Sequence, residues 1–209
     1  MNERLFLNSA PELQGDNMIP EYGMYENSES AHECQLSTLH LSNGRIFIRG
    51  DITPDTAARF ASAMLYLSVD KTPVTLYINS GGGEINSGLL MYDLIRSYKG
   101  TLDIYCIGRA ASMAAVLLAG GQKGRRYALP HSQVMIHEPL IAGGYGGSAS
   151  TIEKTARSIL EVRDTLNGLI AENTGHTLEE INKATETDYW MDAQQAVDFG
   201  ICDEIRSIY

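Results

Sequence analysis

The sequence has few cysteines, and they lie far apart. Cys34, Cys106 and Cys202 are the three cysteines in 209 residues, and no two of them form a Cys-x-x-Cys pair. A scattered, odd-numbered set indicates neither a disulfide framework nor a zinc site, so we expect no bound metal. The sequence therefore favours a reducing compartment.

Long apolar runs are also absent. Near the start only Leu5, Phe6 and Leu7 are consecutive apolar residues, a run much shorter than the core of a secretory signal peptide. No later stretch approaches the roughly 18 apolar residues that a membrane-spanning helix needs. We therefore expect a cytoplasmic protein that does not bind membranes.

Basic residues are scarce as well. Lysine and arginine number 16 against 26 aspartates and glutamates, which gives a net charge of −10. A nucleic-acid binder neutralises phosphates with clustered cations, so we expect no nucleic-acid partner. The one basic cluster is Lys123, Arg125 and Arg126, and three charges on one turn predict a solvated loop more than a binding patch.

The composition that remains is that of one globular domain. Apolar residues make up 44% and charged residues 20% of a chain of 209 residues, which is enough for one core and too short for two. Residues 1–31 are polar and have no sustained periodicity, so they are interpreted as a flexible arm or removable leader. Residues 32–209 are expected to form a single domain.

From residue 35 onward, strands, glycine turns and helices alternate. Thr53 and Pro54 are typical of a helix start, and Gly175 of a helix end. The predicted strands cover 39–41, 45–48 (joined to the first by a turn at Asn43-Gly44), 74–78, 102–107 and 133–136, and the predicted helices 54–65, 89–95, 110–119 and 150–173, followed by two shorter helices and a last strand. This order predicts an α/β domain of repeated strand-turn-helix units, with helices covering the sheets.

Ser112 stands in the segment Gly108-Arg-Ala-Ala-Ser-Met-Ala-Ala, at a predicted junction of strand and helix. A hydroxyl at a helix N-terminus lies beside free N–H groups that favour developing negative charge. Ser112 is therefore a candidate nucleophile. A helix-capping serine in a tight turn explains the same segment equally well.

Three glycines, Gly81, Gly82 and Gly83, follow a predicted strand and precede a helix. A phosphate-binding loop is one interpretation, but the P-loop lysine and the GxGxxG spacing are missing. Glycines also let a backbone N–H face a reacting carbonyl, as in an oxyanion hole. A plain turn remains the third interpretation.

His137 ends the strand 133–136 and is the candidate general base, since a neutral imidazole is the usual base for a serine hydroxyl. His131 has the same parity along the strand, so periodicity does not choose between the two histidines. A buried structural histidine is the alternative role, and no third ligand suggests a metal pair.

Four carboxylates near the end of the chain could orient a histidine: Glu186, Asp188, Asp192 and Asp198. Asp192 and Gln195 are spaced as a capping box, which gives Asp192 a structural role. Asp198 falls inside the following helix and is expected to be solvated. Asp188, followed by Tyr189 and Trp190, is free to hold an imidazole.

Together these segments resemble the proteolytic subunit of the Clp protease, the ClpP family, from about Arg45 to Ile205. The resemblance rests on several motifs in the family's order: Leu76-Tyr-Ile-Asn-Ser-Gly-Gly-Gly83, Gly108-Arg-Ala-Ala-Ser-Met-Ala-Ala115, Gly121-Gln-Lys-Gly-Arg-Arg126, Leu129-Pro130 and Met135-Ile-His-Glu-Pro139. It implies the ClpP/crotonase-like fold with a protruding handle helix, here at about 140–175.

The resemblance also implies a role for each site residue. Ser112 matches the family's nucleophile, His137 its base and Asp188 its third triad member, and this choice removes His131. Gly83 and Met113 match the positions whose backbone N–H groups form the oxyanion hole. The implied activity is that of a serine endopeptidase that degrades unfolded protein to peptides.

The family's assembly is implied in the same way: heptameric rings stacked in pairs, fed by a AAA+ unfoldase. No cofactor is implied for this chain, because ATP is used by the partner ATPase. The family's docking pocket for that ATPase matches five positions in this sequence, namely Tyr77, Tyr105, Ile107, Tyr127 and Leu129.

The sequence departs from the family at several points. Gly81, Glu138 and Thr187 stand where proline, glutamine and arginine are usual, and the arm before Arg45 lacks the axial-pore motif. These departures are compatible with a divergent or phage-type variant.

Two other functions fit part of the pattern. A crotonase-like acyl-CoA enzyme has a related fold but needs no Ser-His-Asp set. A catalytically weak regulatory subunit of a mixed ring is the other, and a complete triad argues against it.

Overall fold

The structure is a computed structural model that describes residues 22–26, 31–140 and 147–208. Most of the arm expected at 1–31 lies outside the described residues. β1 (Tyr22–Glu26), in that segment, pairs antiparallel with β2 (Ala31–Gln35), at its end, as a separate two-stranded sheet. The sequence did not predict this pair, because neither segment alternates apolar and polar residues as a half-buried strand does.

The main sheet has seven strands and positions the site. Its strands are β3 (Arg45–Ile52), β4 (Val74–Gly83), β5 (Leu102–Ala111), β6 (Arg126–Ala128), β7 (Gln133–Ile136), β8 (Tyr189–Asp192) and β9 (Glu204–Ile205). The order β3-β4-β5-β6-β9 is parallel throughout, β7 pairs parallel with β5, and β8 pairs antiparallel with β7. Strands that alternate with helices in a mostly parallel sheet confirm the expected α/β class.

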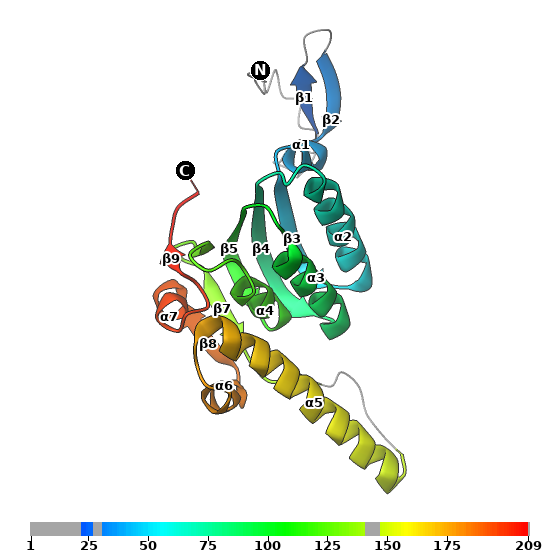
Figure 1. Cartoon of the computed structure of the whole chain (residues 1–209), viewed down its shortest axis with the longest axis vertical. Coiled ribbons are helices and arrows are strands. Elements are labelled where there is room, and N and C mark those ends of the chain that lie inside the picture. The colour runs from blue at the N-terminus through cyan, green and yellow to red at the C-terminus, as the bar shows by residue number, and fades with distance from the viewer. Residues whose placement is uncertain (1–21, 27–30, 141–146, 209) are drawn as a thin grey trace, which may run out of the picture.

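Three of the helices cover one face of this sheet. The helices are α1 (Leu36–Ser42), α2 (Pro54–Ser68), α3 (Ile85–Ser97), α4 (Met113–Ala119), α5 (Ala149–Thr174), α6 (Leu178–Thr185) and α7 (Ala193–Asp198). Figure 1 shows α2, α3 and α4 together on one face of β3, β4 and β5, while α5 extends away from the sheet. Every residue of α4 is buried, so its small, apolar sequence is a requirement of its central position.

The prediction of a strand at 39–41 is wrong, because α1 covers these residues. Asn43 ends this helix: its side-chain amide donates to the carbonyl of Leu39 at 2.7 Å. Gly44 then takes a positive φ of 68°. An Asn-Gly pair suits both a hairpin turn and a helix end, because both need a left-handed residue, and the sequence alone does not separate them.

The predicted start of a helix at residue 110 is wrong, because β5 extends to Ala111 and α4 begins at Met113. Two other predicted helix boundaries are confirmed. Thr53 caps α2, with its hydroxyl accepting from the N–H of Thr56, and Gly175 ends α5 in the left-handed conformation. The predicted glycine turns are wrong, however: Gly81–Gly83 lie inside β4 and Gly108 inside β5. Their backbones remain paired, since Gly82 and Gly83 lie opposite Asp51 and Ile52 of β3.

The basic cluster at 123–126 is only partly a solvated loop. Arg126 is 2% exposed, and its Nη2 and Nε donate to the carboxylate of Asp203 at 2.6 and 2.9 Å. Its Nη1 also donates to the carbonyls of Ala119 and Asn173, in the last turns of α4 and α5. Burial would raise the pKa of Asp203, but the hydrogen bonds from Arg126 outweigh it and lower that pKa below the usual value. Arg126 therefore joins β6, two helix ends and the C-terminal segment.

We expect Arg126→Met to lower the free energy of unfolding by about 3–5 kcal/mol, because it leaves a largely buried carboxylate without its partner. Arg125→Met is the matched control: Arg125 also binds an aspartate, Asp103, at 2.8 Å, but its side chain is 43% exposed. Its loss should cost less than about 1 kcal/mol. Urea denaturation of both variants measures the difference, and equal losses would contradict this account.

Candidate active site

Three neighbouring strands bring the predicted triad together. Ser112 follows β5, His137 follows β7, and Asp188 precedes β8. In the parallel pair β5–β7, Ala111 lies opposite Met135, and the N–H of Ser112 donates to the carbonyl of Met135 at 2.8 Å. In the antiparallel pair β7–β8, Ile136 lies opposite Tyr189. One step further on each strand sets His137 opposite Asp188.

The three side chains form a continuous chain of hydrogen bonds. The Nε2 atom of His137 lies 2.9 Å from the Oγ atom of Ser112, and its Nδ1 atom lies 3.1 Å from Oδ1 of Asp188. A carboxylate only accepts, so Nδ1 carries the hydrogen and Nε2 is left to accept from the serine hydroxyl. The imidazole is 13% exposed and the carboxylate 59% exposed. The histidine is thus held in the tautomer that a general base requires.

The backbone at Ser112 decides between a nucleophile and a helix cap. Ser112 is the N-cap residue of α4, yet its side chain makes no capping hydrogen bond. Its φ of 55° is a left-handed value that non-glycine residues rarely adopt. This sharp turn between β5 and α4 directs the hydroxyl toward His137 and away from the helix N–H groups. The capping interpretation is therefore wrong, and the strained geometry is one that functional sites often keep.

The glycines of β4 pack directly against the nucleophile. Gly82 has a φ of 96°, and a Cβ atom there would lie 2.7 Å from the carbonyl oxygen of Ala111 and 2.8 Å from Cβ of Ser112. No side chain fits at this position. On α3, Gly88 leaves room in the same way for the side chain of Met113, whose Cγ would lie 2.1 Å from a Cβ at residue 88. Close backbone approach explains both glycines.

The rival residues lie elsewhere. His131 is exposed in the turn between β6 and β7, so it is not on the strand as its parity suggested. Asp192 and Gln195 form the expected capping box of α7. Asp198 ends the same helix, is exposed and accepts from Gln194. Glu186 is exposed at the end of α6.

Cys106 and Cys202 are buried free thiols. Burial raises the pKa of Cys106 to about 11 and raises that of Cys202 further, so neither is a nucleophile near neutral pH.

A small apolar hollow is lined in part by residues that follow the site residues along the chain. It measures about 110 Å³ and is lined by Ile85, Pro139, Leu140, Ser158, Ile159 and Val162. Ile85 is two residues after Gly83, and Pro139 is two residues after His137, whereas the triad residues themselves do not line the hollow. Its far wall is the middle of α5.

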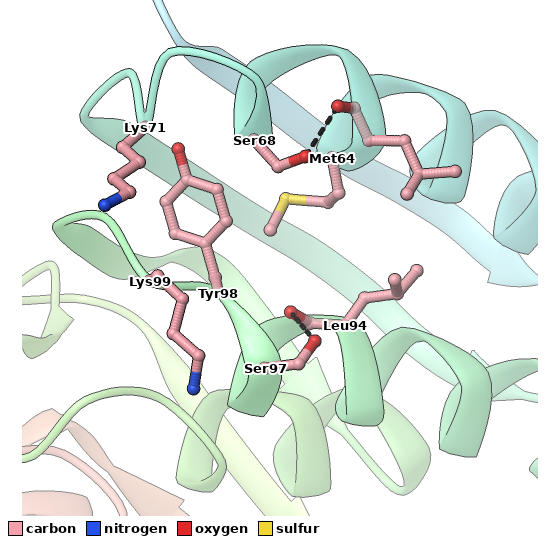
Figure 2. Close-up of a pocket in the computed structure, with 8 residues that line it drawn as sticks. Met64, Ser68, Lys71, Leu94, Ser97, Tyr98 and Lys99 are labelled. Carbon is pink, nitrogen blue, oxygen red and sulfur yellow. Dashed lines mark hydrogen bonds between the residues drawn. The ribbon is translucent and has the colours of Figure 1, made fainter.

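A larger cavity, of about 250 Å³, lies away from the triad. Figure 2 shows it between the C-terminal ends of α2 and α3, with Tyr98 in its wall and Lys71 and Lys99 at its rim. None of the triad residues lines it, so volume alone is a poor guide to the chemistry in this fold. Within the ranges 22–26, 31–140 and 147–208, no group of three metal-ligating side chains converges. In the same ranges no helix is long and apolar enough to cross a bilayer.

Comparison with known proteins gives two findings. The sequence model of the family described as "Clp protease" matches residues 28–208. The chain is also 36% identical, over 201 residues, to a protein of Rhodopirellula baltica named "ATP-dependent Clp protease proteolytic subunit 1"; the alignment covers 95% of this chain and 88% of that protein. The chain belongs to the Clp protease family.

Clp proteases are serine peptidases, and the resemblance inferred from the motifs is therefore confirmed at the level of the family. The sequence missed one element of the site, β8, which sets Asp188 opposite His137. Its signal was the short run of strand-forming residues Tyr189, Trp190 and Met191. Asp192, the last residue of this strand, also caps α7. The residues that remain are too few for the sequence to distinguish a strand from a loop.

Three of the docking positions expected in a Clp protease form part of a continuous line of rings. This aromatic row consists of Phe47, Tyr77, Tyr105 and Tyr127, one from each of β3, β4, β5 and β6, in register. Neighbouring ring centroids lie 4.8, 5.7 and 4.7 Å apart. Phe47, which is 38% exposed, is not among the five expected positions. Ile107 and Leu129, the other two expected positions, are half-buried and adjacent, since the N–H of Leu129 donates to the carbonyl of Cys106.

Proposed function

We propose that this chain is a serine endopeptidase in which Ser112 attacks the peptide carbonyl, His137 takes the serine proton and Asp188 orients the imidazole. The observation that carries the proposal is the continuous hydrogen-bonded chain at 2.9 and 3.1 Å. The serine in this chain of hydrogen bonds makes no helix-capping hydrogen bond. The same arrangement of groups serves acyl transfer on unrelated folds, in any chain order.

Two backbone amides are proposed as the oxyanion hole. Met113 is the first residue of α4, so its N–H has no acceptor within the helix. Just after β4, the N–H of Glu84 donates to the carbonyl of Ile52 on β3. Because N–H directions alternate along a strand, that of Gly83 points to the opposite edge, where Ser112 lies. The two donors support a tetrahedral oxyanion above the serine.

The reaction then runs in two steps. The carbonyl carbon bonds to Oγ of Ser112 while the proton moves to Nε2 of His137, and the imidazolium gives this proton to the departing amine. Water next attacks the acyl-enzyme, again losing its proton to His137, and the acid and Ser112 are released. These steps use only groups of this chain and water.

The apolar hollow supports a preference in the acyl part of the substrate. A side chain of the residue whose carbonyl is attacked can enter the space lined by Ile85, Pro139 and Val162. A substrate side chain in this space also contacts α5, which forms the far wall of the hollow. This contact helps to hold α5 against the rest of the domain. Unfolded protein, which exposes apolar side chains, fits this requirement.

The assembly implied by the family is part of the proposal. α5 has its buried residues, Leu166, Asn167 and Ile170, in its second half only, while Ile152 and Leu160 nearer its start are 54% and 48% exposed. A second chain that covers these residues would explain them, as in two stacked heptameric rings. The aromatic row and the pair Ile107 and Leu129 are proposed to receive a AAA+ unfoldase.

A fluorophosphonate probe tests the proposal directly. The probe reacts with a serine whose hydroxyl is activated by a neighbouring base, so we expect a single adduct, on the peptide that contains Ser112. Mass spectrometry of a digest locates the adduct. His137→Ala should abolish labelling, whereas His131→Ala, a matched change at an exposed turn histidine, should not. Equal labelling of the parent and of His137→Ala would reject the proposal.

A further inference from the structure

Arg109 lies close to the triad in the sequence and has no acidic partner among the described residues. It lies in β5, ahead of Ser112, and is exposed. Within the described ranges its guanidinium makes no hydrogen bond or ion pair, whereas Arg125 and Arg126 each bind an aspartate. An arginine fork recognises carboxylates well, so an unpaired one beside a reaction centre favours an anionic group on the ligand.

The guanidinium lies over the strand of the proposed oxyanion hole. Its Nη2 atom is 3.2 Å, and its Cζ atom 3.7 Å, from the position that a Cβ atom at residue 81 would occupy. Gly81 has no side chain, so the cation rests against the β4 backbone just ahead of Gly82 and Gly83. Asp51 lies opposite Gly82 on β3 but makes no ion pair with Arg109.

The order of residues along β4 determines which part of the substrate lies near Arg109. The apolar hollow begins at Ile85, on one side of Gly83, and Arg109 lies over Gly81, on the other side. If the acyl side chain occupies the hollow, the leaving peptide extends toward Arg109. Strands rise about 3.3 Å per residue, so Gly81 is about 7 Å from Gly83. This distance corresponds to the first or second residue after the scissile bond.

The charges on the two sides of Ser112 are opposite in sign. Glu84 and Glu138 are exposed and adjoin Ile85 and Pro139 of the hollow. The Glu84 carboxylate is fixed there, because it accepts from the N–H of Ser87 at 2.9 Å. The acyl side of the site is therefore negative and the Arg109 side positive. Such a field orients a charged chain as well as binding it.

We propose that Arg109 selects substrates with an acidic side chain at the first or second position after the scissile bond. The inference rests on the proposed peptidase function and adds to it a specificity-determining residue. The carboxylate binds the guanidinium over Gly81, and this contact sets the register of the leaving peptide while its amide lies at Ser112. Glu84 and Glu138 disfavour the same acidic residue on the acyl side.

Matched internally quenched peptides test this inference on the full chain. The peptides carry Asp or Asn at one position, placed in turn before and after the bond. At the first or second position after the bond we expect the Asp peptide to have the higher kcat/KM, by about 1.5- to fivefold, the range of an exposed ion pair. The ratio should shrink between about 0.1 M and 1 M salt.

Variants of Arg109 complete the test. Arg109→Gln should bring the Asp-to-Asn ratio to about one, Arg109→Lys should keep part of it, and Arg109→Glu should reverse it in favour of a basic residue. Arg59→Gln is the matched control: Arg59 is an exposed arginine on α2, paired with Asp55, and its loss should leave the ratio as in the parent.

The possible results distinguish failure of this inference from failure of the proposed function. A protein that labels at Ser112 and cleaves Asp and Asn peptides equally at every position overturns the role of Arg109 alone. Retention of the ratio in Arg109→Gln overturns it as well. A protein that cleaves no peptide and does not label at Ser112 removes the peptidase function, and the inference with it.

Discussion

Ser112→Ala should lose peptide hydrolysis almost completely, with turnover falling by a factor on the order of 10⁶. The substitution removes a single heavy atom, Oγ, which in the proposed mechanism bonds to the carbonyl carbon of the substrate. The fold should be unaffected, because the Ser112 side chain makes no capping bond to α4. A fluorogenic peptide assay beside thermal unfolding of both proteins measures the two quantities.

Ser132→Ala is a useful companion to this variant. Ser132 is buried and its hydroxyl bonds to the carbonyl of Cys106 at 2.7 Å, so this loss should reduce stability while the residual folded protein stays active. Equal peptide hydrolysis by the parent and Ser112→Ala would reject the proposed chemistry. Lost activity in both serine variants, with both folded, would show that the assay does not report on Ser112.

Asp188→Asn is the second change with a large expected effect. Asparagine can donate to Nδ1 of His137, which stabilises the wrong tautomer and removes the negative charge that stabilises the imidazolium. We expect turnover to fall by about 10²–10⁴. The carboxylate is 59% exposed, so water can replace part of its effect and the lower half of this range is expected.

A neighbouring variant makes the test specific. Asp192→Asn changes a nearby carboxylate that caps α7, and asparagine caps helices about as well. We expect its turnover to stay close to that of the parent. An equal loss of turnover in Asp188→Asn and Asp192→Asn would assign the effect to the general loss of negative charge.

The parts of the site that sequence could predict are those where one residue type has one structural use. Glycine is such a residue: Gly82 lets β4 approach the backbone of Ser112, and Gly88 leaves room on α3 for the side chain of Met113. The capping residues Thr53 and Asp192 were predicted for the same reason. Each satisfies a local backbone need that does not depend on the rest of the fold.

The parts that could not be predicted depend on partners distant in the chain. Arg126 was predicted to lie in a solvated loop, and only the folded structure brings Asp203 beside it. The Asn43-Gly44 pair likewise ends a helix in which the Asn43 side chain binds the carbonyl of Leu39. The strand β8 is four residues long, and its identity comes from pairing with β7. The choice of His137 over His131 likewise came from the family resemblance, since the distance to Ser112 is a property of the folded sheet.

The pairing of β7 with β8 also has a consequence for the order in which the site is completed during synthesis. Ser112 and His137 follow β5 and β7, whereas Asp188 belongs to the later segment that leads into β8. A partly synthesised chain can thus pair β5 with β7 while the carboxylate that we propose to orient His137 is still missing. The imidazole is held in place only once β8 has been made and has paired with β7.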